Sequence, residues 1–154
     1  MFKTITKSSS IGKSALAAIL FSATLFGGAI PVSASGDNAV VGDATRGQSL
    51  FKRCAACHRI GPNAKNAVGP ELNLIIGRPA GSVDGYRYGT GLTAANQAGL
   101  VWNTENLVEY IMNPKVFVRS FLDDNSARVK MTFRMRKQVD AQDVIAYLAS
   151  LQEE

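Results

Sequence analysis

Cysteine and histidine are scarce in this chain of 154 residues, which contains two cysteines and one histidine. Cys54, Cys57 and His58 lie close together, with two residues between the cysteines. So few cysteines exclude a small domain held together by several disulfides. A tetrahedral zinc site is disfavoured, because no fourth cysteine or histidine completes the ligand set. A disulfide across two residues would constrain the unfolded chain very little.

Charged side chains are also few, with 17 lysines and arginines against 12 aspartates and glutamates. This composition excludes a disordered polyelectrolyte, and no segment repeats at a fixed period, so we expect one small domain. The net charge of +5 includes three lysines among the first 34 residues, and without them 14 basic and 12 acidic residues leave +2. Global charge therefore gives no reason to expect nucleic acid as a partner. So small a domain has a thin core, which a bound prosthetic group would help to fill.

Residues 1–34 have the pattern of a bacterial secretory signal. Three lysines precede an apolar, uncharged run over residues 15–30, and the small residues Val32 and Ala34 form a cleavage signal. We expect a cleavable signal peptide over residues 1–34 and one mature domain over residues 35–154. The mature protein is then expected in the periplasm, without stable membrane insertion. An uncleaved membrane anchor is the alternative.

Two helices are expected early and midway in that domain. Asp43 can accept hydrogen bonds from the free amides of a first turn, so it is expected to cap a short helix that leads to Cys54. A second helix is expected to begin near Asn103 or Thr104. It should end before Pro114, which cannot continue it.

The clearest helical pattern lies near the C-terminus, where four residues form one apolar stripe. These are Val144, Tyr147, Leu148 and Leu151. Asp140 is expected to cap this helix, Asp143 to add charge to its first turn, and Val139 and Val144 to occupy staple positions. Between Arg59 and Val101 glycines and prolines interrupt any periodicity, and no segment alternates like a strand. The predicted fold class is all-α, with three or more short helices whose long loops wrap a flat apolar cofactor.

The sequence Cys54-Ala55-Ala56-Cys57-His58 fits C-x-x-C-H, the attachment motif of c-type haem. Two thiols three positions apart on a helical turn can reach the vinyl groups on one edge of a porphyrin. The next residue then directs its imidazole towards the iron. A thioredoxin-like redox pair is the main alternative, but it would need a preceding strand and a βαβ layout, and neither is indicated.

The sixth position of a haem iron cannot be filled by a second histidine in this chain. Met, Lys, water or an empty position remain. The methionines of the predicted domain are Met112, Met131 and Met135. Met112 lies in a predicted helix and suits packing, whereas Met135 stands between two arginines and is expected to be exposed. Position therefore favours Met131.

Ordered matches along the chain resemble the class I cytochromes c, the soluble bacterial and mitochondrial electron carriers. They are Gly47 and Phe51 before the motif, Gly69-Pro70-Glu71-Leu72, Gly77-Arg78, Gly85-Tyr86-Arg87-Tyr88, Trp102, Glu109 to Pro114, Lys130-Met131-Thr132-Phe133 and Asp143 to Leu148. Two stretches depart from the pattern. Residues 115–129 are several residues longer than in mitochondrial relatives and lack their Pro-Gly-Thr, and residues 89–99 are slightly expanded.

The resemblance implies one covalently attached haem c with His58 and Met131 as axial ligands. It implies that the first and last helices cross, with Gly47 close to Tyr147. It also implies roles around the haem. Pro70 offers its carbonyl to the His58 ring, Arg78, Tyr88 and Trp102 donate to a buried propionate, and the Tyr110 hydroxyl approaches the Met131 sulfur. Alternatively, Trp102 and Tyr110 serve packing alone and Arg78 is a solvated charge.

The expected function is that of a periplasmic, monomeric one-electron carrier and not of an enzyme. It would shuttle electrons between respiratory or photosynthetic membrane complexes, such as quinol:cytochrome c reductase and a terminal oxidase. If Met131 does not bind, a five-coordinate haem would suit a gas sensor or a peroxidase-like enzyme. A third possibility is the haem subunit of a periplasmic dehydrogenase.

Basic residues concentrate in one stretch, where residues 115–137 carry seven basic and two acidic side chains. The basic ones are Lys115, Arg119, Arg128, Lys130, Arg134, Arg136 and Lys137. The local charge is +5, while the rest of residues 35–154 sums to −3. A basic surface around the predicted ligand would steer the protein onto redox partners with acidic docking surfaces.

Overall fold

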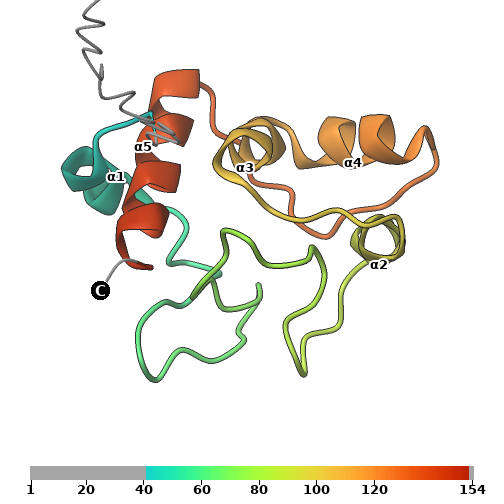
Figure 1. Ribbon diagram of the computed structural model, residues 1–154, viewed down its shortest axis with the longest axis horizontal. Helices are drawn as coiled ribbons and strands as arrows, with labels where there is room; N and C mark the ends of the chain where they lie inside the picture. The colour runs from blue at the N-terminus through green and yellow to red at the C-terminus, as the bar shows by residue number, and fades with distance from the viewer. Residues whose placement is uncertain (1–40, 153–154) are drawn as a thin grey trace, which may run out of the picture. The chain divides into compact units, whose positions relative to one another are not determined.

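The computed structural model describes residues 41–152, so the predicted signal peptide over residues 1–34 lies outside the described part (Figure 1). Five α-helices occur in the described residues: α1 (Ala44–Phe51), α2 (Thr90–Gln97), α3 (Thr104–Met112), α4 (Pro114–Leu122) and α5 (Gln138–Ser150). Residues 41–152 contain no strand and only one isolated bridge, between Pro79 and Val101. The all-α prediction is therefore confirmed. None of the helices between residues 41 and 152 is long and apolar enough to span a bilayer.

Helix α1 packs against α5, as Figure 1 shows. Asp43 caps α1 as predicted, because its carboxylate accepts a hydrogen bond of 3.0 Å from the Arg46 amide. Asp143 of α5 is almost completely buried and accepts from the Asp43 amide at 2.8 Å and from the Arg46 side chain. This carboxylate therefore joins the start of α1 to α5 instead of adding an exposed charge to the first turn.

The two helices approach most closely at Gly47. A Cβ atom built there would lie 1.9 Å from the Asp143 carbonyl oxygen and 2.9 Å from the Tyr147 Cβ. The predicted contact between Gly47 and Tyr147 is thus confirmed. Phe51 lies one turn further on and meets the Tyr147 ring edge to face, with 5.7 Å between centroids.

Gly47→Ala is expected to destabilise the folded protein by about 3 kcal/mol or more, because the clash is with backbone and cannot be relieved by a rotamer change. The free energy of unfolding from denaturant titration measures the effect. Gln48→Ala is the matched control, since Gln48 is the exposed neighbour on the same helix and should change stability by no more than about 0.5 kcal/mol. Equal effects of the two changes would contradict a close helix crossing.

Helix α3 begins where the sequence predicted, with a capping box between Asn103 and Asn106. Pro114 ends α3 as expected, but it also occupies the first position of α4, a helix that we did not predict. Proline is favoured there because its missing N–H needs no partner and its φ suits a helix. The Asn113 side chain accepts from the Val116 amide and caps α4. Helix α4 therefore occupies the first part of the lengthened stretch, and its C-cap Asp123 lies in the left-handed region with a φ of 48°.

Helix α2 is also absent from the predicted helices, because glycines such as Gly89 and Gly91 ordinarily interrupt a helical pattern. Here the two glycines allow a close backbone approach instead. A Cβ at Gly91 would lie 2.6 Å from the Arg128 carbonyl oxygen, and the Gly91 amide donates to that oxygen at 2.9 Å. A Cβ at Gly89 would lie 3.2 Å from the same oxygen. The long loop prediction for residues 59–101 is thus wrong over residues 90–97.

Helix α5 was predicted correctly but begins earlier than expected. Its N-cap is Lys137, which makes no side-chain capping bond, and Asp140 lies within the first turn. The prediction that Asp140 caps the helix is therefore wrong. Val139 is 48% exposed, so the predicted staple with buried Val144 does not form either.

Candidate haem site

A cavity of about 350 Å³ lies among the residues that follow α1, the long loop, α3, residues 130–135 and α5. Its size falls within the range of cofactor pockets, and its walls are largely apolar. Every site residue predicted from the sequence, from Cys54 to Met131, lines this cavity. Residues up to 77 positions apart in the chain therefore meet at one place.

Cys54 and Cys57 lie on helical turns that continue from α1. The Cys54 amide donates to the Phe51 carbonyl at 2.8 Å, and the Cys57 amide donates to the Cys54 carbonyl at 2.9 Å. Both cysteines are free and half-buried. Burial raises the pKa of the Cys54 thiol to about 11, so this thiol is protonated at neutral pH. Two unbridged thiols thus line the same cavity, as the attachment motif requires.

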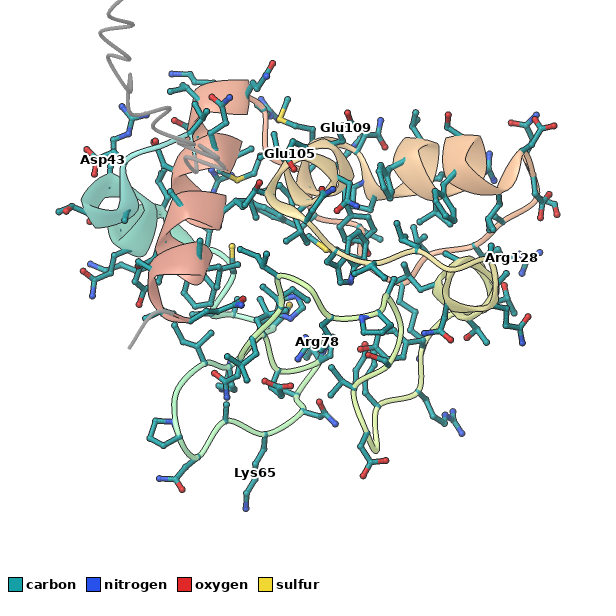
Figure 2. All side chains as sticks on the ribbon, in the orientation of Figure 1. Asp43, Lys65, Arg78, Glu105, Glu109 and Arg128 are labelled. Carbon is teal, nitrogen blue, oxygen red and sulfur yellow. The ribbon has the colours of Figure 1, made fainter. Side chains whose placement is uncertain are left out.

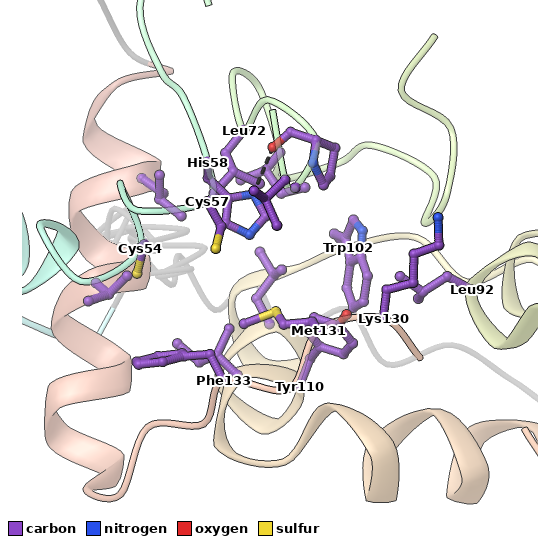
Figure 3. A pocket seen from close by; sticks show the side chains of 18 of the residues that line it. Cys54, Cys57, His58, Leu72, Leu92, Trp102, Tyr110, Lys130, Met131 and Phe133 are labelled. Atoms are coloured by element: carbon purple, nitrogen blue, oxygen red, sulfur yellow. Dashed lines mark hydrogen bonds between the residues drawn. The ribbon is translucent and has the colours of Figure 1, made fainter. Parts of the chain in front are cut away.

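His58 has a fixed ring orientation and tautomer. Its Nδ1 lies 2.7 Å from the Pro70 carbonyl oxygen, the contact that the resemblance implied (Figure 3). Because a carbonyl can only accept, Nδ1 carries the proton and Nε2 keeps a free lone pair. Burial lowers the pKa of the imidazole, which favours the neutral form that a metal ligand needs. Gly69 lies against the ring, and a Cβ there would come within 2.4 Å of Cε1.

Met131 lies across the cavity from His58, with Tyr110 beside it (Figure 3). Tyr110 is buried, and burial raises the pKa of its hydroxyl. The segment that carries Met131 is held at both ends. The Arg119 guanidinium donates to the Ala127 carbonyl at 3.2 Å, and the Met135 amide donates to the Ile111 carbonyl at 2.8 Å.

The prediction that Met135 is exposed is wrong, because its side chain is only 2% exposed and lines the cavity. Its two neighbours Arg134 and Arg136 are exposed, whereas the Met135 side chain turns into the cavity. The Arg53 guanidinium lies 4.0 Å from the Met135 sulfur. Two methionines therefore line the cavity, and one of them already has a cationic neighbour.

The three predicted propionate donors all line the cavity, but each also contacts protein. The Tyr88 hydroxyl accepts from the Val83 amide at 3.3 Å. Trp102 packs on Tyr110 with ring centroids 4.9 Å apart, as the packing alternative proposed. Arg78 donates to Glu71, a partner that was not predicted from the sequence. The only signal for Glu71 was its position as the variable residue of the Gly-Pro-x-Leu pattern.

The donor set fits a haem better than a bare metal ion. Within residues 41–152 no three His, Cys, Asp or Glu side chains gather into a metal-binding group. A neutral imidazole and a thioether sulfur lie on opposite walls and would suit an iron whose remaining ligands come from a macrocycle. The apolar walls suit a flat porphyrin, and the two thiols at one side suit its attachment.

Comparison with known proteins agrees with this chemistry. Residues 44–152 match the family model for cytochrome c. Cytochrome c2 of Rhodopseudomonas palustris is 44% identical over 115 residues, which cover 71% of this chain and 98% of that relative. Cytochrome c2 iso-1 of Rhodospirillum centenum is 42% identical over 113 residues, or 70% of this chain and 94% of that protein.

The solved structure of cytochrome c2 from Rhodospirillum centenum matches with a TM-score of 0.69 and 40% identity, covering 71% of this chain and 98% of that one. Both the family model and relatives covered along nearly their whole length support one assignment. The chain belongs to the class I cytochromes c, as a mono-haem electron carrier whose cysteine pair is consistent with a covalently bound haem c.

Proposed function

We propose that this protein is a periplasmic one-electron carrier and not an enzyme. It would move electrons between respiratory or photosynthetic membrane complexes such as quinol:cytochrome c reductase and a terminal oxidase. One observation carries the proposal: the His58 imidazole and the Met131 sulfur face each other across an apolar cavity. We assign these two residues as the axial ligands and the two cysteines as the covalent attachment.

When bound, the haem supplies an iron that gains and loses one electron. The chain's own residues set how readily this happens. The Pro70 carbonyl holds the His58 ring and raises the basicity of its Nε2. The Met131 thioether favours the reduced ion, and the apolar walls disfavour the extra charge of the oxidised one. If His58 and Met131 both hold the iron, oxygen and peroxide would find no open site there.

The absorption spectrum of the purified protein tests this assignment against the alternatives. We expect low-spin bands, including the weak long-wavelength band of sulfur-ligated ferric haem, and no carbon monoxide binding to the reduced form. High-spin bands with ready carbon monoxide binding would instead support a gas sensor or a peroxidase-like enzyme. Stable copurification with a dehydrogenase would support the subunit alternative.

The periplasmic location is proposed from the signal pattern over residues 1–34. An exported protein whose mass matches a chain that starts at Ser35 would support this location. A mass that still includes the lysines at the N-terminus would instead indicate an uncleaved anchor. We further propose that the exported protein is a monomer that binds neither nucleic acid nor the membrane stably.

Six of the seven basic side chains in residues 115–137 are exposed, and we call them the basic surface. They are Lys115, Arg128, Lys130, Arg134, Arg136 and Lys137. Arg119 is half-buried and donates to the Ala127 carbonyl, so it serves the fold. Lys130 is partly engaged as well, since its ammonium donates to the Arg87 carbonyl. Of the other five, Arg128, Arg134 and Arg136 lie nearest to Met131 in the sequence, so these three are the ones to test first.

Replacing Arg128, Arg134 and Arg136 together by glutamine should slow oxidation by an acidic membrane oxidase about tenfold at low ionic strength, and much less at high salt. Stopped-flow kinetics over a salt series measure the effect. Lys65→Gln is the control, because Lys65 lies on the loop after His58, away from Arg128 (Figure 2). A triple variant with an unchanged rate at low salt would remove the basic surface from the docking model.

A further inference from the structure

Glu71 and Arg78 form a half-buried ion pair at the edge of the haem cavity. The Arg78 Nη1 donates to Glu71 Oε1 at 2.7 Å, and the two side chains are only 17% and 20% exposed. Arg78 also donates to the Asn73 carbonyl at 2.8 Å and to the Glu71 carbonyl at 3.0 Å. Three bonds therefore hold this guanidinium from one side.

Glu71 is itself held in place. Its Oε2 accepts from the Asn73 amide at 2.6 Å, and its own amide donates to the Asn66 side chain at 3.2 Å. The carboxylate thus cannot leave Arg78 without losing a second bond. A fixed, poorly hydrated pair of this kind is screened by salt much less than an exposed pair.

Arg78 lines the cavity, whereas Glu71 does not. A guanidinium has five N–H groups, and the three bonds to Glu71 and Asn73 leave two without an acceptor among the described residues. These two remaining donors are available to an anionic group inside the cavity. A propionate of a cofactor bound in the cavity could therefore share this cation with the Glu71 carboxylate.

We propose that Glu71 is a positioning residue that sets the reduction potential by sharing Arg78 with a haem propionate. This inference rests on the proposed function, because it needs a haem in the cavity. With Glu71 ionised, two carboxylates compete for one guanidinium, and the pocket edge keeps a net negative charge. Negative charge near the iron opposes the arrival of an electron. Glu71 thus lowers the potential below the value that Arg78 alone would give.

The Glu71→Gln variant tests this role, because the amide oxygen can still accept from Arg78 and the side chain keeps its size. We expect the equilibrium constant for reduction to shift about threefold towards the reduced form, equivalent to about 28 mV for a one-electron couple. Spectroelectrochemical titration of the intact holoprotein at fixed pH measures this shift. Glu71→Asp keeps the charge, so we expect it to restore most of the original potential.

Glu105→Gln is the matched control, because it makes the same charge change at an exposed glutamate in the first turn of α3. A Glu71→Gln shift no larger than that of Glu105→Gln would overturn the proposal. So would an equal shift in Glu71→Asp, because shape rather than charge would then be responsible. Failure of the proposed function is seen separately, as an absence of low-spin, sulfur-ligated haem bands in the unmutated protein.

Discussion

Met131→Leu is expected to convert the low-spin haem into a form that binds carbon monoxide and to lower its reduction potential. Leucine has a similar volume but no sulfur, so the cavity stays filled while the sixth ligand is lost. We expect the equilibrium constant for reduction to fall at least about tenfold, which lowers the potential by 59 mV for one electron. Absorption spectra with and without carbon monoxide, together with a redox titration, measure both effects.

Met135→Leu is the matched control for that change. Both methionines lie in residues 130–135 and line the same cavity, but the Met135 sulfur has Arg53 beside it. We expect the Met135 variant to keep its low-spin spectrum and its potential nearly unchanged. The ligand assignment would have to be exchanged if Met135→Leu opened the site and Met131→Leu did not.

Replacing Cys54 and Cys57 together by alanine should have the largest effect on folding. Without thioether bonds the haem can be extracted, and its removal leaves the cavity of the domain empty. A cavity of about 350 Å³ at roughly 24 cal/mol per Å³ amounts to about 8 kcal/mol. That penalty is comparable with the whole stability of a small domain, about 5–15 kcal/mol. The pigment-free chain should therefore show no cooperative unfolding.

Extraction with acidified organic solvent, followed by thermal circular dichroism of the pigment-free chain, checks both parts of this result. The control replaces Ala55 and Ala56 by serine, since both are exposed and lie between the thiols. That variant should keep its pigment through extraction. Pigment that remained bound to the double alanine chain would refute attachment at these cysteines, and a sharp melting transition without pigment would refute the folding argument.

The helices that could be predicted from the sequence are those whose starting signals are local. Asp43 and Asn103 cap α1 and α3 by accepting from amides within the next few residues. The position of the capping residue in the sequence is therefore sufficient to predict where each helix begins. The signals of α2 and α4 were misleading. Gly91 is needed for a contact with Arg128 that is distant in sequence, and Pro114 ends one helix while it starts another.

Some features of the candidate site could likewise be predicted from the sequence, and others could not. The motif identified the cysteines and His58, and family resemblance supplied Pro70, whose carbonyl lies where it was expected. The burial of Met135 and the pairing of Glu71 with Arg78 depend on how irregular segments fold around the cavity. Such segments have no periodicity from which the direction of a side chain could be predicted.

The unexpected helix α4 has a consequence for the ligand segment. A longer insertion would ordinarily allow more conformations, because closure entropy increases with loop length. Here the added residues coil into a helix whose Arg119 holds the backbone at Ala127, and the Gly91 amide holds the next carbonyl. The segment around Met131 that lies between anchored backbone positions is therefore shorter than the spacing in the sequence implies. The added residues thus fix the backbone on the N-terminal side of Met131 instead of loosening it.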